Sequence, residues 1–304
     1  FWFKIWQFYS VIAKTEPKKI KKITGPKFYQ TIWFDGATLN FAENLLCGKP
    51  DTTALSFINE QGKHSQLTYA QLKILVARLS NAMRNQGITK EDRVVGLMPN
   101  CIETVVAMLA TTSLGAIWSS CSPDFGLQGV LDRFGQIKPK LMFITDGYQY
   151  NDKAHDCLNK IEPLLLNISS LEKIIVCPFN EIKPQLPVTE HAQLLNDFLS
   201  NDTTLTFEAV PFNHPLYIMY SSGTTGSPKC IVHSVGGTLL QHLKELSLHT
   251  NLTNKDTMFF FTTCGWMMWN WMISSLALGT HIILYEGSPT YQRTDHLFKL
   301  VDQF

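Results

Sequence analysis

The sequence predicts an α/β fold in which parallel sheets are flanked by helices. Short apolar runs rich in β-branched and aromatic residues recur along the chain, and most are separated by segments with helical periodicity. Near-continuous apolar strands that alternate with helices are typical of parallel sheets buried on both faces. The expected strands are 94–98, 116–118, 141–145, 173–177, 216–220, 258–261 and 281–285.

Three helices between these strands have start and stop signals in the sequence. Thr68 and Gln71 have the spacing of a capping box, and Asn100 and Glu103 repeat it. The Ser122-Pro123 pair predicts a third helix with Pro in its first turn. The three helices are expected to end at Gly87, at Gly115 and before Pro139.

The chain is expected to have two parts. Residues 1–48 lack the strand–helix alternation and are interpreted as an N-terminal extension, whereas residues 49–304 form the α/β domain. Residues 180–215 have weak periodicity and are expected to connect two strand–helix units. A helix is expected near the start of the chain. Its apolar face, suited to docking, would consist of Phe1, Ile5, Phe8, Tyr9 and Ile12.

Composition and charge narrow the class of protein. Of 304 residues, 45% are hydrophobic and 17% are charged, which favours an ordered chain with a large core. A net charge of +1 gives no general attraction to nucleic acid or to an anionic membrane, so an anionic ligand needs a local site. The seven cysteines are scattered singly, as expected in a reducing compartment, and indicate a cytoplasmic protein. The oligomeric state is not indicated.

Residues 257–285 contain no Asp, Glu, Lys or Arg and are long enough to span a bilayer. Gly265, Asn270 and Gly279 interrupt the segment, and its two ends are β-rich. We therefore favour a buried strand–helix–strand unit over a transmembrane helix and expect no stable membrane insertion.

The segment 220–229, YSSGTTGSPK, follows an expected strand and has the composition of a polyphosphate-binding loop. Its glycines allow amide N–H groups to converge on one anion, its hydroxyls add neutral donors, and its lysine adds a positive charge. The alternative is an ordinary surface loop. The residues expected to bind the phosphates of ATP are Ser221, Ser222, Gly223, Thr224, Thr225, Gly226 and Lys229.

Two commoner phosphate-binding motifs do not fit this loop. A Walker A motif has Gly directly before its Lys, and here that position is Pro228. The dinucleotide fingerprint GxGxxG is also absent from the loop. Kinase-like and Rossmann-type interpretations are therefore disfavoured.

The run SSGTTGSPK resembles the phosphate-binding signature of the adenylate-forming superfamily, and its flanks are similar to short-chain acyl-CoA synthetases. Trp33-Phe34 and LNFAENL at 39–45 resemble the N-terminal extension of those enzymes. Further segments are similar to the acetoacetate-activating members: IWSS at 117–120, SPDFG at 122–126, VLDRF at 130–134, KCIVHS at 229–234, QHLKE at 241–245 and GWMMWNWM at 265–272.

This resemblance implies an acid–CoA ligase that uses ATP, Mg²⁺ and coenzyme A, with an acyl-adenylate intermediate and acetoacetate as the leading substrate. Thr224 and Lys229 are then the expected catalytic residues, with Thr224 also serving Mg²⁺ and Lys229 assisting the departure of pyrophosphate. The family's later elements are expected beyond Phe304, so the fold is expected to be incomplete at the C-terminus. Alternatives are another short-chain acid (acetate, propionate or butyrate) or an inactive nucleotide-binding fragment.

The same resemblance places the acyl pocket at Trp266, Met267, Met268, Trp269 and Asn270, with Asn270 as a donor to the keto oxygen. The alternative is that these are ordinary core residues, because a half-buried helix also selects Trp and Met. A separate group, His242, Glu245 and His249, shares one helical face. These three side chains could bind a metal ion, but a solvated polar face is the favoured interpretation.

Overall fold

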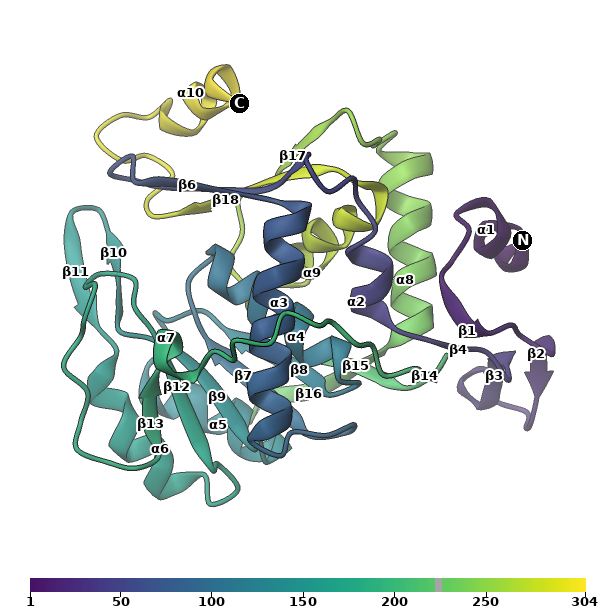
Figure 1. Ribbon diagram of the computed structural model, residues 1–304, viewed down its shortest axis with the longest axis horizontal. Helices are drawn as coiled ribbons and strands as arrows, with labels where there is room; N and C mark the ends of the chain where they lie inside the picture. The colour runs from purple at the N-terminus through teal and green to yellow at the C-terminus, as the bar shows by residue number, and fades with distance from the viewer. Residues whose placement is uncertain (222–225) are drawn as a thin grey trace.

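Two β-sheets with helices packed between them form the framework of the protein (Figure 1). The computed structural model describes residues 1–221 and 226–304. Within this part of the chain, the larger sheet has seven strands in the order β13-β12-β9-β7-β8-β15-β16. Their bounds are β7 (Arg93–Leu97), β8 (Ile117–Cys121), β9 (Leu141–Thr145), β12 (Lys173–Cys177), β13 (Ala192–Leu194), β15 (Pro215–Ser221) and β16 (Lys229–Ser234).

The smaller sheet has four strands in the order β17-β18-β5-β6. They are β5 (Thr53–Asn59), β6 (His64–Thr68), β17 (Thr257–Phe259) and β18 (His281–Glu286). Most neighbouring strands in both sheets are parallel, which confirms the predicted fold class. The edge strands β16 and β6 run antiparallel to their neighbours, which the sequence did not indicate.

Helices cover both faces of the larger sheet. One face packs against α2 (Phe41–Leu45), α3 (Tyr69–Asn85) and α4 (Ile102–Ser113), and the other against α5 (Leu127–Ile137) and α6 (Ile161–Asn167). Val94 therefore lies in the core between the sheets, while its neighbour Val95 lies in the second core under α5 and α6. Because successive strand side chains point to opposite faces, this arrangement explains why the strands are apolar at nearly every position.

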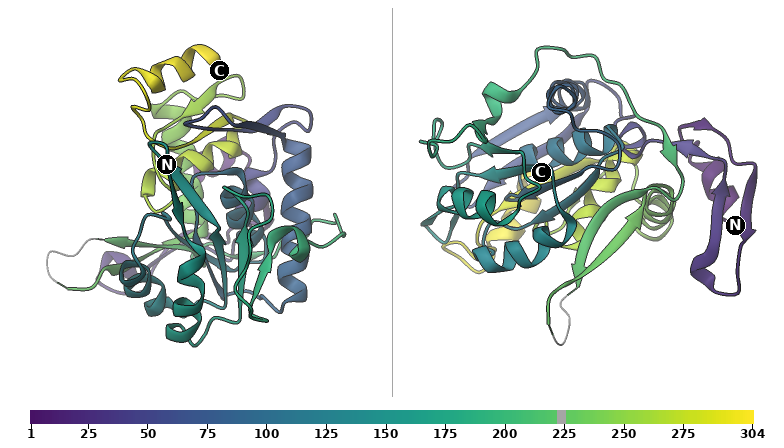
Figure 2. Two further views of the ribbon diagram at one scale, coloured as in Figure 1. Left: turned by 90° about the vertical axis from the view of Figure 1, so that its left-hand side faces the viewer. Right: turned by 90° about the horizontal axis from the view of Figure 1, so that it is seen from below.

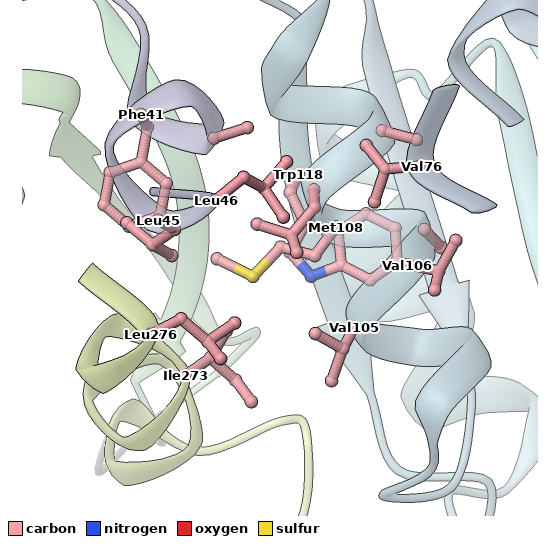
Figure 3. Close-up of a cluster of buried hydrophobic side chains, with 14 of the residues drawn as sticks. Phe41, Leu45, Leu46, Val76, Val105, Val106, Met108, Trp118, Ile273 and Leu276 are labelled. Atoms are coloured by element: carbon pink, nitrogen blue, oxygen red, sulfur yellow. The ribbon is translucent and has the colours of Figure 1, made fainter. Parts of the chain in front are cut away.

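The core between the sheets joins distant parts of the chain. Figure 3 shows its centre, where Leu45 of α2, Met108 of α4, Trp118 of β8 and Ile273 converge. All four side chains are buried. Truncation of such a side chain to Ala costs about 2–5 kcal/mol, so these contacts hold α2, α4 and β8 against the segment that contains Ile273.

Two helix starts differ from the prediction, whereas the capping box of Thr68 with Gln71 is confirmed. The predicted capping box of Asn100 with Glu103 is wrong, because Cys101 precedes α4 and the Asn100 side chain bonds to other segments. The third helix begins at Leu127 after Gly126 instead of at Ser122-Pro123, which lies in the turn that leaves β8.

The N-terminal segment forms a lobe beside the main body (Figure 2). It contains α1 (Trp2–Phe8), β1 (Ala13–Thr15), β2 (Lys19–Ile23), β3 (Thr31–Asp35) and β4 (Thr38–Leu39), and β4 also pairs with β14 (Val210–Pro211). The predicted docking face is wrong in part. Phe1, Phe8 and Ile12 are exposed, whereas Ile5 and Trp6 are the buried residues of α1.

Residues 257–285 form the predicted strand–helix–strand unit, with α9 (Met267–Ile273) and a 3₁₀ segment η4 (Ser274–Leu278) between β17 and β18. In the described part of the chain, no helix combines the length and apolar character needed to cross a bilayer. The remaining elements are β10 (Gly147–Tyr150), β11 (Lys153–Asp156), α7 (Leu195–Phe198), α8 (Val235–Leu243), the π-helical turn η3 (Lys244–His249) and α10 (His296–Gln303).

Candidate active site

The ends of the predicted phosphate-binding loop are the two strands of an edge hairpin. Ser221, the last residue of β15, pairs with Lys229, the first residue of β16. Figure 2 shows this green hairpin projecting from the edge of the larger sheet. Antiparallel pairing places the side chains of Ser221 and Lys229 on the same face of the hairpin at the base of the loop. Lys229 is exposed to solvent, as a residue that binds an incoming anion requires.

Of the other predicted loop residues, Gly226 has φ of +95°, and among the described residues none lies within 4 Å of where a Cβ would be. This left-handed conformation is one that glycine adopts at no steric cost, and the role of Gly226 in binding phosphate stays a prediction. Ser222, Gly223, Thr224 and Thr225 lie outside the described residues.

Helix α5 contacts the hairpin through a side-chain hydrogen bond. The Gln136 Nε2 donates to the Pro228 carbonyl at 2.8 Å, which ties the helix to the far end of the loop. Near the other end, a cavity of about 290 Å³ opens beside the loop. Its lining residues are Ser120, Cys121, Phe125, Arg133, Tyr220, Ser221, Gly265 and Trp266.

The five predicted acyl-pocket residues fall into three environments. Trp266 is 69% exposed and lines the cavity beside Ser221. Met267 and Met268 line a second, larger cavity. Trp269 is fully buried and donates its indole N–H to Asn100. Asn270 is also buried: its Nδ2 lies 3.2 Å from Met219 Sδ, and its Oδ1 has no hydrogen-bond partner among the described residues.

The larger cavity, of about 610 Å³, lies between β16, α8, η3 and α9. Sequence reasoning did not identify it, because its walls come from four separate elements. Besides Val232, Gly237, the two methionines and Trp271, it is bordered by polar residues, which are His233, Ser234, Thr238, Gln241, His242, Glu245, His249 and Thr250. Gln241 donates to Glu245 at 2.6 Å, so these two polar groups are paired.

The interpretation of His242, Glu245 and His249 as a solvated polar face is wrong for His242. This side chain is only 4% exposed, and its Nδ1 lies 2.7 Å from the Ser274 hydroxyl. Burial lowers its pKa to about 4, so the imidazole is neutral at pH 7. Among the described residues, no group of three or more His, Cys, Asp or Glu side chains is arranged to hold a metal ion.

A third cavity, of about 330 Å³, lies where β8 and β18 end. Asp124, Tyr148, Tyr150 and His155 line it together with Glu286. Burial raises the pKa of Glu286 to about 7, and a hydrogen bond from the Asn100 amide opposes that rise. Ser122 and Asp124 of the segment SPDFG also line this cavity, but no local pattern predicted that they meet Glu286.

Comparison with known proteins identifies the class to which this fold and loop belong. The family model described as "AMP-binding enzyme" matches residues 44–304, so the chain belongs to that family. This confirms the predicted resemblance to adenylate-forming enzymes.

Individual relatives narrow the comparison further. The chain is 49% identical over 291 residues to acetoacetyl-coenzyme A synthetase of Rhizobium meliloti (strain 1021), covering 95% of this chain and 44% of that protein. It is 43% identical over 312 residues to acetoacetyl-CoA synthetase of Rattus norvegicus, covering 100% of this chain and 46% of that protein. The solved structure of acetoacetyl-CoA synthetase from Streptomyces lividans matches with a TM-score of 0.94 and 39% identity, over 100% of this chain and 46% of that one. The chain therefore spans less than half the length of these relatives.

Proposed function

We propose that this chain is the ATP-binding part of an acid–CoA ligase that activates acetoacetate. The complete reaction converts acetoacetate and ATP into acetoacetyl-AMP and pyrophosphate, then transfers the acyl group to coenzyme A with release of AMP. The observation that carries the proposal is the similarity of the whole chain to proteins named acetoacetyl-CoA synthetase. We also propose a cytosolic location and a division into an extension (1–48) and the AMP-binding region (49–304).

The hairpin loop supports a role in binding the triphosphate. Activation of a carboxylate requires an enzyme to screen the charge between two anions and to stabilise the departing pyrophosphate, which fixed dipoles and cations do well. Lys229, opposite Ser221, supplies a positive charge at the base of the loop. Together with Ser222, Gly223, Thr224, Thr225 and Gly226 it would hold the β- and γ-phosphates, and the Thr224 hydroxyl would serve a Mg²⁺ ion that neutralises them.

The acyl group is proposed to bind at the segment 266–270. Met267 and Met268 supply a soft apolar wall to the larger cavity, which suits the methyl end of a short acid. Asn270 remains the proposed partner of the keto oxygen. The donor that this role requires is the Asn270 Nδ2, whose contacts are long ones, 3.2 Å to Met219 Sδ and 3.4 Å to the Trp266 carbonyl, so a ligand oxygen could compete for it.

Nucleotide binding tests the phosphate role directly. In calorimetric titrations with ATP and Mg²⁺, we expect Lys229→Ala to weaken binding by about tenfold, because it removes a charge-assisted contact. Lys255→Ala, which removes an exposed lysine that lines a different cavity, is the matched control and should leave the affinity unchanged. Equal affinities of the wild type and the Lys229 variant would contradict the proposed role.

Pyrophosphate release with acetoacetate, acetate, propionate and butyrate tests the acid. We expect the highest rate with acetoacetate, and Asn270→Ala should reduce the preference for acetoacetate over butyrate. A maximum with another acid would favour a different short-chain acyl-CoA synthetase. Because the chain spans less than half of its relatives, a second candidate is a nucleotide-binding fragment. ATP binding without release of pyrophosphate with any acid would favour that candidate.

A further inference from the structure

Arg133 occupies a distinctive place beside the proposed phosphate-binding loop. It lies on α5 and lines the cavity of about 290 Å³ together with Tyr220 and Ser221, the last residues before the loop. Its guanidinium carbon lies 4.4 Å from the centre of the Phe125 ring and 5.9 Å from that of Tyr220. Tyr220 is itself fixed, because its hydroxyl accepts a hydrogen bond from Ser119 at 3.2 Å. The two aromatic rings therefore hold the cation in a defined position.

The charge of this guanidinium is not neutralised by the part of the protein that the structure describes. Within residues 1–221 and 226–304, Arg133 forms no ion pair. Its hydrogen bond there runs from Nη1 to the Gly129 carbonyl at 2.8 Å, one turn earlier in the same helix. A guanidinium has five N–H donors, so this contact leaves most of them available to a ligand.

Partial burial makes such a cation a strong anion site. The Arg133 side chain is half-buried, so its interaction with an anion is screened less than on an open surface. The planar fork of N–H groups matches two oxygens of a phosphate and is already positioned by the aromatic rings. Ser221 lines the same cavity and adds a small polar side chain beside the guanidinium.

Helix α5 connects this cation to the far end of the loop. Gln136 follows Arg133 by three residues and so lies on the same helical face, where its amide binds the Pro228 carbonyl. One short helix therefore contacts both the start of the hairpin turn, through Arg133 near Tyr220, and its end, through Gln136. An anion held by Arg133 would lie beside the loop rather than at a separate surface.

We propose that Arg133 is a further phosphate-binding residue, whose guanidinium binds phosphate oxygens in the cavity beside Ser221. The proposal rests on the proposed function and deepens it, because it adds a cation to the phosphate end of the site. The phosphate belongs to one of two sources, the polyphosphate of ATP or a phosphate of coenzyme A.

Calorimetric titration with inorganic pyrophosphate and, separately, with coenzyme A distinguishes these sources. Arg133→Met keeps much of the apolar stem and removes the charge, and it should weaken binding of one of the two ligands by about tenfold. An effect on pyrophosphate assigns Arg133 to the polyphosphate, and an effect on coenzyme A assigns it to that cofactor. Unchanged binding of both ligands, or no binding of either by the wild-type chain, would overturn the proposal.

Two further variants control for charge and folding. Arg293→Gln removes an exposed arginine paired with Asp295, and it should leave both affinities unchanged. Arg133→Lys keeps a positive charge but not the fork, so its affinity should fall between those of the wild type and the Met variant. If thermal unfolding shows that Arg133→Met is misfolded, the Lys variant decides: an affinity equal to the wild type for both ligands overturns the proposal.

The Lys229 variant separates this proposal from the proposed function. If Lys229→Ala weakens ATP binding while Arg133→Met changes neither pyrophosphate nor coenzyme A binding, the loop function stands and the Arg133 role is wrong. If Arg133→Met weakens pyrophosphate binding while Lys229→Ala leaves ATP binding intact, the Arg133 site stands and the role of Lys229 is wrong.

Discussion

The indole Nε1 of Trp269 donates a buried hydrogen bond of 2.9 Å to Asn100 Oδ1, which joins α9 to the turn between β7 and α4. Asn100 also donates through its side chain to the carbonyls of Thr262 and Tyr285, and through its backbone amide to the Glu286 carboxylate. This asparagine therefore connects the larger sheet to the end of β18 in the smaller sheet. The cavity lined by Glu286 lies beside this connection.

Replacement of Trp269 by Phe should destabilise the protein substantially. The smaller ring leaves a cavity and leaves Asn100 Oδ1 unpaired in the core, and we expect a loss of about 2–4 kcal/mol in the free energy of unfolding. Urea unfolding of both proteins measures this loss. Trp266→Phe is the control, since Trp266 is 69% exposed, and it should change stability by less than about 0.5 kcal/mol. Equal losses of stability for the two substitutions would show that the Trp269–Asn100 hydrogen bond does not contribute measurably to the free energy of unfolding.

The role of Asn100 also shows where sequence reasoning about the fold fails. The strands of the larger sheet were predictable because burial on both faces requires apolar residues throughout, as in Leu141–Thr145. The Asn100–Glu103 spacing predicted a capping box just as clearly, but the Asn100 side chain forms tertiary hydrogen bonds that no local sequence pattern indicates. Strand β16 was not predicted because it lacks the pattern that marks the buried strands. It lies at the sheet edge with Ile231 and Val232 exposed, so it has no run of buried positions to mark it.

The candidate site was predictable only where its residues are adjacent in sequence. Ser221 and Lys229 belong to one motif, and the hairpin register places them together. Arg133 and Gln241 lie in the segments VLDRF and QHLKE, but neither segment indicates that its residues border the site. Arg133 comes near Ser221 only because α5 packs beneath the hairpin, and Gln241 borders the larger cavity only because α8 faces α9.

His242 should make stability depend on pH. Its folded-state pKa of about 4 is below the ordinary value of 6.5, so the unfolded chain binds a proton in this range that the folded protein does not. Stability is therefore fully present above pH 6.5 and is lost as the pH falls toward 4, by about 3 kcal/mol at most. Urea unfolding of the wild type and of His242→Gln between pH 4 and 7.5 measures the difference.

The Gln variant keeps a polar group that can pair with Ser274 but does not titrate in this range. Its stability should fall less steeply than that of the wild type on acidification, and the difference between the two proteins should change most between pH 6.5 and 4. His191→Gln, at an exposed imidazole, controls for the loss of one histidine. Parallel pH profiles for the wild type and the His242 variant would contradict a buried neutral imidazole.

Glu286 should have the opposite effect on stability. Its pKa is raised from 4.5 to about 7 in the folded protein, so between these values the folded protein retains a proton that the unfolded chain has lost. Stability falls as the pH rises from 4.5 to 7 and stays reduced above that. Gln can accept the same hydrogen bond from the Asn100 amide without ionising, so Glu286→Gln should be more stabilising at pH 8 than at pH 4, by about 3 kcal/mol at most. A stability difference that does not vary with pH would refute the raised pKa.

Two glycine-to-alanine substitutions provide a matched test of how the N-terminal lobe docks on α8. Gly236 packs against Phe212, and an added Cβ would lie 2.1 Å from that ring, too close without a shift of the aromatic group. Phe212 in turn stacks on Phe34 of β3, with ring centres 4.5 Å apart. Gly236→Ala should therefore cost about 1–3 kcal/mol through overpacking at the junction of the lobe with α8.

Gly135→Ala in α5 is the control, because apart from its own helical turn no residue that the structure describes lies within 4 Å of the added methyl group. Alanine favours a helix over glycine, so this variant should be more stable by about 0.5–1 kcal/mol. Thermal or urea unfolding of the two variants beside the wild type gives both values, and limited proteolysis of residues 1–48 reports whether the lobe has loosened. If Gly236→Ala loosens the contact between the lobe and α8, it should also speed cleavage within residues 1–48. A loss of stability with unchanged cleavage would mean that the substitution acts within α8 and not on the docking of the lobe.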